Sequence, residues 1–370
     1  MNDTTDTDPD LDVKLDRLRD VLESREVDEI WLATSSNFAW LLGGENLVNR
    51  SSEPGIAAVG FDGDRVTVLT TNIEATRLAA EEVPTTVALH DFDWFEQSLQ
   101  EAIQDHASGE AIADIDVAGA KMLSAPTFRL PLTRADRERF RSLGSDVARA
   151  LETACRQIHP DDTERDVAAA VQYELALAAI DAPVVLVGGE SRAPRYRHFT
   201  PTDTPIGGYG IVSVSARRGG PWISATRTVA FDPPSWLSSH HAAATRVDAS
   251  AIAASRAFSG SGTAGDVFAA IDHAYRQVGF EGEWRHHHQG GAAGFAAREW
   301  VATPDHPRRI ESPCTFSWNP TVQGAKSEDT VLLHDDQIEV ISQTGEWPTS
   351  EVRAIGFDDV IVRHDVLDLS

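Results

Sequence analysis

The alternation of apolar and polar residues over the first 120 positions predicts short helices and strands in turn. Apolar side chains recur at helical spacing from Leu11 to Glu23, and Glu29–Ala33 is typical of a strand. A short helix over Phe38–Leu42 and a hairpin around Asp62-Gly63-Asp64 follow. The other elements expected here are helices over 74–80 and 92–104 and strands near 87 and over 115–119. This alternation predicts an α/β domain over residues 11–128.

A second domain is expected over residues 133–365, where longer helices accompany the strands. A helix with one apolar face begins at Thr133 and ends before Pro160. Thr163 followed by Asp166, and Thr263 followed by Asp266, are capping signals for two further helices. Another helix, rich in alanine, is expected over 235–258. Helix pairs therefore accompany strands twice along this part of the chain.

The stretch Ile211–Phe231 reads as two strands joined by a turn. A run of β-branched residues is interrupted at Arg217-Arg218-Gly219-Gly220-Pro221, and the chain resumes as an extended segment from Trp222 to Val229. Taken alone, this is an ordinary β-hairpin.

The composition indicates a folded protein with a strongly acidic surface. The chain has 370 residues, 41% of them hydrophobic, and 58 acidic against 32 basic residues give a net charge of −26. Lysine occurs only at Lys14, Lys121 and Lys326, so almost all basic residues are arginine. Self-repulsion of this size is tolerated where salt screens it, so we infer a halophilic, cytoplasmic protein. The same charge argues against nucleic acid or an anionic membrane as a partner.

Cysteines and apolar runs exclude further classes of protein. Cys155 and Cys314 form neither a disulfide framework nor a zinc-binding spacing. We find no apolar run near the roughly 18 residues that cross a bilayer. The acidic start MNDTTDTDPD is unlike a signal peptide.

The order of motifs along the second half resembles the creatinase and aminopeptidase P family, metallopeptidase family M24. His198 precedes the hairpin, which ends in Ser224-Ala225-Thr226-Arg227-Thr228. His287 to Gly294 then resembles the family's H-x-x-G-H-G-x-G strand, and Asn319-Pro320 and Glu328-Asp329-Thr330 follow. The resemblance implies two domains, an N-terminal creatinase-like α/β domain and a C-terminal pita-bread α+β domain. It also implies a homodimer.

The resemblance implies a dinuclear metal site made of two Asp, one His and two Glu. Position by position, these five ligands fall on Ser213, Ser224, Gly291, Asn319 and Glu328. Two divalent ions bring four positive charges, and Ser, Ser and Asn cannot replace three of the four carboxylates that offset them. A single ion would keep only Glu328, which is too few ligands. We therefore expect no metal and no other cofactor.

Two histidines are the candidate catalytic groups. The resemblance implies that His198, 15 residues before Ser213, is the acid/base next to a scissile C–N bond, because an imidazole titrates near neutrality. The alternative is a structural hydrogen bond to the backbone. His287 falls on the family's substrate-side His. If residues 286–288 form a strand, His286 and His288 face away from the pocket, and a metal cluster of the three is disfavoured.

Glu328 is the third candidate catalytic residue. A lone buried carboxylate tends to have a raised pKa, which suits an acid/base, but a salt bridge to Lys326 or Arg227 is nearly as well supported. The candidate substrate-binding residues are Arg227, Asn319 and Trp318. Structural pairing beneath the site is the alternative for Arg227, and core packing is the alternative for Trp318.

Three functions are consistent with this sequence. The first is a hydrolase that cleaves a C–N bond in a small carboxylate-bearing substrate or short peptide without metal. The second is a conventional Xaa-Pro aminopeptidase, which the lost ligands oppose. The third is a catalytically inactive protein that binds ligands in the old pocket. Turnover would favour an enzyme, and tight binding without turnover would favour the third.

Overall fold

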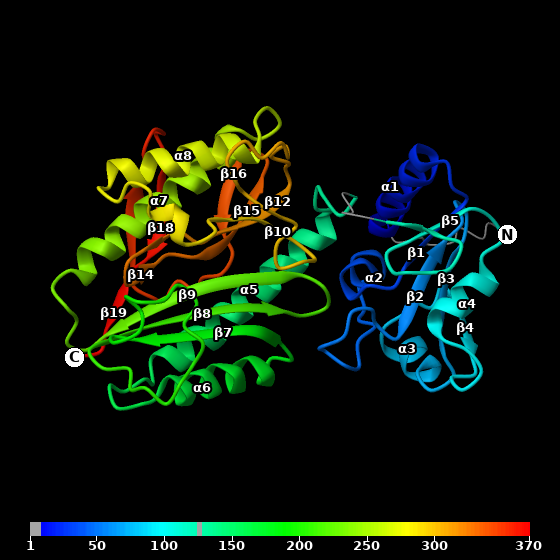
Figure 1. Cartoon of the computed structure of the whole chain (residues 1–370), viewed down its shortest axis with the longest axis horizontal. Helices are drawn as coiled ribbons and strands as arrows, with labels where there is room; N and C mark the ends of the chain where they lie inside the picture. The colour runs from blue at the N-terminus through cyan, green and yellow to red at the C-terminus, as the bar shows by residue number, and fades with distance from the viewer. Residues whose placement is uncertain (1–8, 124–127) are drawn as a thin grey trace. The chain divides into compact units, whose positions relative to one another are not determined.

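The boundary between the two parts of the chain lies near the start of helix α5 (Arg134–Cys155). The computed structural model describes residues 9–123 and 128–370, and it divides there into two compact units, 1–135 and 136–370 (Figure 1). Both units are mixtures of helices and strands, so the expected α/β class is confirmed. No helix in the described ranges combines the length and apolar character needed to cross a membrane.

The first unit is built on a six-stranded mixed sheet with strand order β4-β3-β2-β1-β5-β6. Most of its elements match the sequence pattern, including the β2–β3 hairpin, where the Asp62 carboxylate accepts the backbone N–H groups of Asp64 and Arg65. The elements are α1 (Pro9–Arg25), β1 (Glu29–Leu32), α2 (Ser35–Leu42), β2 (Ala57–Phe61), β3 (Val66–Thr71), α3 (Ala75–Glu81), β4 (Ala88–Phe92), α4 (Leu99–His106), β5 (Ala111–Ala113) and β6 (Lys121–Met122).

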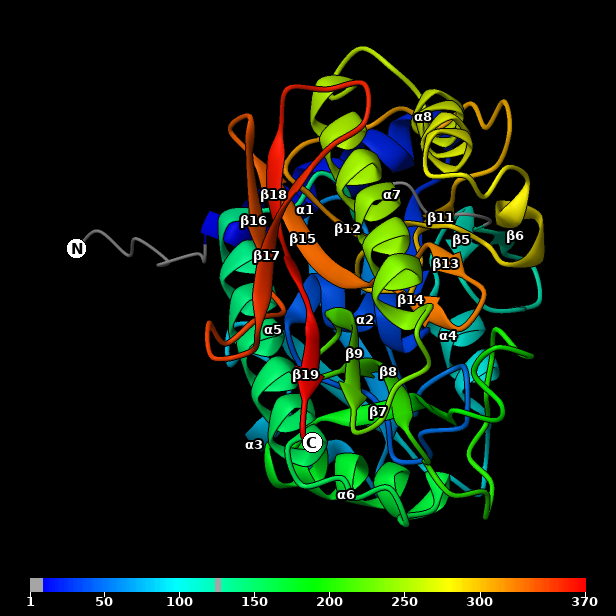
Figure 2. The ribbon, with the colours of Figure 1, turned by 90° about the vertical axis from the view of Figure 1, so that its left-hand side faces the viewer.

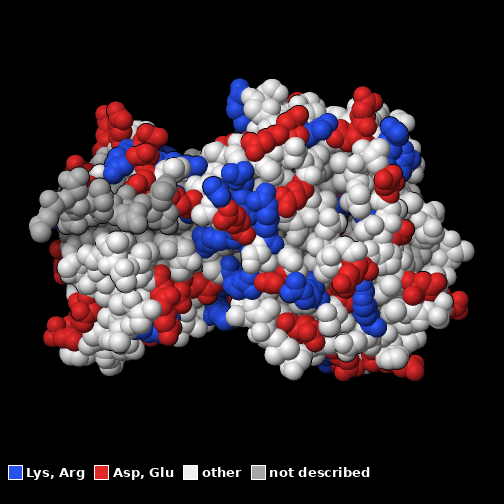
Figure 3. Space-filling model, turned by 180° about the vertical axis from the view of Figure 1, so that it is seen from behind, with Lys and Arg blue, Asp and Glu red and all other residues white. Residues whose placement is uncertain are grey.

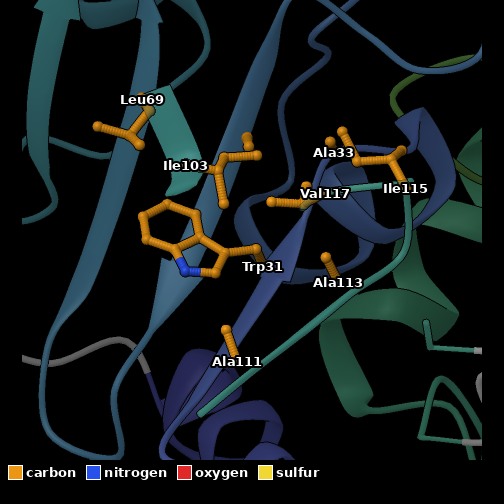
Figure 4. Packing of buried hydrophobic residues seen from close by; sticks show 9 residues of the cluster. Trp31, Ala33, Leu69, Ile103, Ala111, Ala113, Ile115 and Val117 are labelled. Carbon is orange, nitrogen blue, oxygen red and sulfur yellow. The ribbon is translucent and has the colours of Figure 1, made fainter. Parts of the chain in front are cut away.

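Trp31 lies at the centre of a cluster of buried apolar side chains in this unit (Figure 4). Its ring packs among residues of β3, α4 and β5, and its indole N–H donates to the Glu29 carboxylate at 3.1 Å. Because the polar end of the indole has a partner, the large ring is buried without leaving a donor unsatisfied. The cluster contains Trp31, Ala33, Ala58, Leu69, Ile103, Ala111, Ala113, Ile115 and Val117.

Two sequence-based boundaries in this unit are wrong. The expected strand over 115–119 is instead β5, which ends at Ala113 because the Asp114 carboxylate accepts the backbone N–H groups of Ala33 and Thr34 and turns the chain. The expected helix over 92–104 begins only at Leu99. Phe92 ends strand β4, and Ser98 caps the helix by accepting the N–H of Glu101.

The second unit contains a four-stranded sheet, β19-β9-β8-β7, and a five-stranded antiparallel sheet, β11-β10-β12-β15-β16. Its elements are α5, α6 (Glu164–Leu177), β7 (Asp181–Gly189), β8 (Tyr209–Arg217), β9 (Trp222–Ala230), α7 (Leu237–Ala257), α8 (Ala264–Gln277), the 3₁₀ helix η1 (Glu283–His286), β10 (Gly290–Ala293), β11 (Trp300–Val301), β12 (Cys314–Trp318), β13 (Thr321–Val322), β14 (Ala325–Lys326), β15 (Asp329–His334), β16 (Gln337–Val340), β17 (Thr349–Arg353), β18 (Val360–His364) and β19 (Val366–Asp368).

Helices pack against the strands of this unit, and α7 and α8 also pack against each other. Helix α6 packs on β7, and α7 runs across β13, β14 and β18 beside α8 (Figure 2). The predicted capping signals are confirmed, because Thr163 and Thr263 each accept the N–H three residues on while Asp166 and Asp266 return the bond. Cys155 and Cys314 are buried free thiols, as expected.

Candidate functional site

The β8–β9 hairpin forms as predicted and carries Ser213 and Ser224 on opposite strands. Across the hairpin, Ser213 lies opposite Thr226, and Ser224 lies opposite Ser215. The Ser213 and Thr226 hydroxyl oxygens lie 2.7 Å apart, and those of Ser215 and Ser224 lie 2.6 Å apart. Both candidate positions are 2% exposed. Each serine hydroxyl therefore has a hydroxyl partner across the hairpin.

Glu328, just before β15, is buried between two cations. Its Oε1 accepts a hydrogen bond from Arg298 Nη2 at 3.0 Å, and its Oε2 lies 2.8 Å from Lys326 Nζ. Thr226 donates to the same Oε2 at 3.2 Å. Burial raises the pKa of the Glu328 carboxyl, but the charges of Lys326 and Arg298 outweigh it and leave the pKa below its usual value. The expected raised pKa is wrong, and the expected ion pair with Lys326 is confirmed.

Arg298 connects Ser224 and Glu328, two of the five positions to which the resemblance assigns metal ligands. Its Nη1 donates to the Ser224 hydroxyl at 3.2 Å while its Nη2 donates to Glu328. The Lys326 side chain, at the end of β14, is 5% exposed. One carboxylate between a guanidinium and an ammonium leaves a net charge of +1.

Gly291 and Asn319 are the remaining two positions to which the resemblance assigns metal ligands. A Cβ at Gly291 would lie 2.1 Å from the carbonyl oxygen of Trp300 and 3.0 Å from its ring, so strand β11 fills the space a side chain would need. Asn319 is 3% exposed, and its backbone N–H donates to Gln289. A dinuclear metal site of the family's kind does not fit these residues, because one carboxylate already paired with two cations cannot offset four positive charges.

Three histidines meet beside this cluster. The Nε2 atoms of His198 and His287 lie 3.2 Å apart, and the His288 ring stacks on that of His287 with centroids 4.5 Å apart. Burial and then the charge of Lys326 lower the pKa of His287 to about 2, and burial also lowers the pKa of His198. Burial, followed by the charge of Arg298, lowers the pKa of His288 to about 4. All three imidazoles are therefore neutral at pH 7.

The expectation that His288 faces away is wrong. The segment is not a strand, since η1 ends at His286 and β10 begins only at Gly290, so the two-residue alternation of a strand does not apply. One ligand atom from each of His198, His287 and His288 lies within 4.8 Å of the others, a grouping that could hold a metal ion. Neutral imidazoles suit zinc, but the cationic charge of Lys326 and Arg298 next to them opposes a divalent ion.

Two predicted substrate-binding residues lie in the protein interior. Arg227 is 1% exposed, and its guanidinium donates to Glu152 and Asp329 at 2.8 and 3.0 Å. Trp318 is 0% exposed, and its indole N–H donates to Ser255. Both arrangements match the structural alternatives, ion pairing for Arg227 and core packing for Trp318.

Sequence reasoning missed Arg298. It named Lys326 as a salt-bridge partner of Glu328, and Lys326 is also the only lysine in the sequence of the second unit. Arg298 lies in the loop between β10 and β11, and nothing in the local sequence marks it.

Comparison with known proteins identifies the fold of the whole chain. The prolidase from Pyrococcus horikoshii OT3 superposes with a TM-score of 0.73 at 15% identity, over 90% of this chain and 98% of that one. The Xaa-Pro dipeptidase from Bacillus anthracis gives 0.72 at 13%, over 97% and 100%. The N-terminal domain of FACT complex subunit SPT16 from Cicer arietinum gives 0.66 at 13%, over 91% and 97%.

These structures establish the two-domain pita-bread fold that the sequence predicts. No curated protein shows a significant match to the chain. Residues 138–335, more than half of the sequence, match the profile of metallopeptidase family M24. The hairpin, the histidines and Glu328 all lie within that range. The chain therefore belongs to metallopeptidase family M24.

Proposed function

We propose that the protein hydrolyses a C–N bond in a small carboxylate-bearing substrate or short peptide without a divalent metal. The observation that carries this proposal is the pairing of Glu328 with Arg298 and Lys326 at 3.0 and 2.8 Å. This carboxylate already has two cationic partners. Proton transfer must then come from side chains rather than from a metal-bound hydroxide.

His198 is the group we assign to proton transfer. It is exposed and neutral, whereas His287 behind it is buried. At 3.2 Å between Nε2 atoms, one imidazole carries the shared hydrogen and the other accepts it, which orients the His198 ring. His198 takes a proton from water as the water oxygen attacks the carbon, and returns it to the nitrogen as the C–N bond breaks. Water is consumed, and the histidine is regenerated.

Glu328 has a different role from the one its sequence context suggested. Because its pKa is lowered, it is ionised at neutral pH and has no proton to donate. Its carboxylate holds Arg298 and Lys326 together through contacts of 3.0 and 2.8 Å. We therefore assign it to positioning and not to proton transfer.

Two observations keep a binding protein as the second candidate. Both oxygens of Glu328 have protein partners, as in a purely structural ion cluster. The same fold also occurs in the N-terminal domain of SPT16, a subunit of the FACT complex. A ligand held tightly but never cleaved would favour this candidate.

A substrate screen tests the proposal. Xaa-Pro dipeptides and small guanidino and amidino acids are incubated with protein in high salt, with chelator or with added Mn²⁺, Co²⁺ or Zn²⁺. We expect turnover that chelator leaves unchanged and that His198→Ala abolishes. The control variant is His273→Ala, an exposed histidine of α8. Turnover that requires added metal would overturn the proposal in favour of a conventional metallopeptidase.

A further inference from the structure

We infer that Arg298 and Lys326, held together by Glu328, form a binding site for a carboxylate group. The inference rests on the proposed function and deepens it, since it names the residues that receive the substrate's carboxylate. The two cations contact Glu328, one of the positions to which the resemblance assigns metal ligands. A negatively charged group of the ligand would be a second anion beside these cations, in addition to Glu328.

The net charge of the cluster of Arg298, Lys326 and Glu328 favours an anionic ligand. Arg298 and Lys326 contribute two positive charges and Glu328 contributes one negative charge, which leaves one positive charge uncompensated among these three groups. The neighbouring imidazoles of His198, His287 and His288 are neutral at pH 7 and add none. A buried region with one excess positive charge favours a ligand with one negative charge.

The hydrogen-bond donors point the same way. A guanidinium has five N–H donors, and Arg298 directs bonds to the Ser224 hydroxyl, the Ala297 carbonyl and Glu328. Within the described residues its buried Nε has no acceptor, and an unsatisfied buried donor is costly. The Lys326 ammonium has three N–H donors, and its acceptor among the residues that the structure describes is Glu328. Donors therefore remain for a ligand oxygen.

The position of the cluster links it to the proposed chemistry. The Arg298 side chain is 14% exposed and His198 is exposed, so solvent reaches both. The positive charge of Lys326 acts on His198, and that of Arg298 acts on His288, so cations and imidazoles share one region. A carboxylate bound to the cations would hold a nearby C–N bond at the His198 imidazole. The ligand class is accordingly a short acid with its carboxylate a few bonds from the scissile nitrogen.

The alternative is a closed structural triad in which the three charges satisfy one another. It predicts no preference for an anion over a neutral molecule of the same shape. It also predicts that replacing Glu328 harms only stability. An anion site predicts the reverse, because Glu328 competes with the ligand for both cations.

Equilibrium binding of acetate and of neutral acetamide, followed by saturation-transfer NMR at constant ionic strength, separates the two. We expect acetate alone to bind. Arg298→Gln and Lys326→Met should each weaken binding about tenfold, while Glu328→Gln should strengthen it by a similar factor. The control is Arg308→Gln, which removes an arginine paired with Glu311 in the same unit. Inorganic phosphate tests whether any small anion binds as well as a carboxylate.

Each outcome decides between the two accounts. Equal binding of acetate and acetamide, phosphate binding more tightly than acetate, or unchanged acetate binding in both cation variants would overturn the inference. If Arg298→Gln fails to fold, Lys326→Arg, which should retain acetate binding, and Glu328→Gln, which should increase it, still decide the matter. Acetate binding without turnover of any substrate would leave the inference standing and overturn the proposed function. Turnover of a substrate without acetate binding would overturn the inference and leave the proposed function standing.

Discussion

The ammonium nitrogen of Lys326 lies 2.8 Å from Oε2 of Glu328, and both side chains are almost completely buried. A lysine ammonium is strongly hydrated in water, so its burial indicates that this ion pair compensates a real desolvation cost. The resemblance assigns a metal-binding glutamate to Glu328. In this structure the cationic partners of its carboxylate are Lys326 and Arg298.

Metal content is the first prediction. Protein purified in high salt and dialysed should carry well under one transition metal ion per chain, because the former ligand positions hold Ser213, Ser224, Gly291 and Asn319. Elemental analysis measures this directly. If zinc is nevertheless retained, the cluster of His198, His287 and His288 is the place to test, and His288→Ala should release it. Two ions that survive dialysis would contradict the prediction.

Acid sensitivity is the second prediction, and its sign follows from His287. An unfolded histidine binds a proton below about pH 6.5, whereas folded His287 stays neutral down to a pKa of about 2. The groups around it are His198, His288, Lys326 and Arg197, none of which favours the imidazolium. The contribution of His287 to the free energy of unfolding is therefore complete above pH 6.5 and declines below it, by up to about 1.4 kcal/mol per pH unit.

Urea unfolding at pH 5 and pH 7 tests this in the parent and in His287→Gln. We expect the parent to lose more stability between the two pH values than the variant does. His273→Gln, the exposed control, should behave like the parent. Equal losses in the parent and in His287→Gln would mean that His287 does not titrate as stated.

The third prediction concerns salt. The net charge of −26 and the acidic side chains spread over the face in Figure 3 repel one another, and the Debye length shrinks to about 3 Å at 1 M salt. The thermal midpoint should therefore rise steeply with NaCl and approach a plateau near molar concentration. Equimolar sucrose, which adds no charge screening, is the control. A midpoint independent of salt would contradict a halophilic origin.

Local signals in the sequence predicted local structure well. The capping pairs Thr163–Asp166 and Thr263–Asp266 lie within one helical turn, so three residues suffice to recognise each. The contact between Arg298 and Glu328 spans thirty positions and depends on how the β10–β11 loop meets β9 and β15. No spacing rule covers such a contact, which is why the residue went unrecognised.

The orientation of the histidine side chains was also not predictable from the sequence. The order of motifs singled out His198 and His287 as candidates, and their Nε2 atoms lie 3.2 Å apart in the structure. The orientation of His288 depends on whether the backbone is a strand or a 3₁₀ turn, and three consecutive histidines carry no periodicity that distinguishes them. Side-chain direction in irregular segments needs the fold itself.

Replacement of His198 is the fourth prediction. His198→Ala should lower kcat on whatever substrate is found by about 10²–10⁴-fold, since general acid–base catalysis contributes that much. The thermal midpoint should change little, because the side chain is exposed and its hydrogen-bond partner within the described residues is the imidazole of His287. A structural histidine would give the opposite result, with stability lost and folded protein still active. His198→Asn, which keeps a polar group, should also be inactive.

Arg227 provides the last prediction, because its role is structural and its removal should not imitate a catalytic defect. Its guanidinium, 1% exposed, donates to Glu152 and Asp329, and Asp329 also pairs with buried Arg363. Breaking a buried ion pair from one side leaves a carboxylate without its partner, which typically costs about 3–5 kcal/mol. Arg227→Met should lower the urea midpoint by a corresponding amount. Activity per folded molecule should stay near the parent value, whereas a substrate-binding arginine would show an increased KM at unchanged stability.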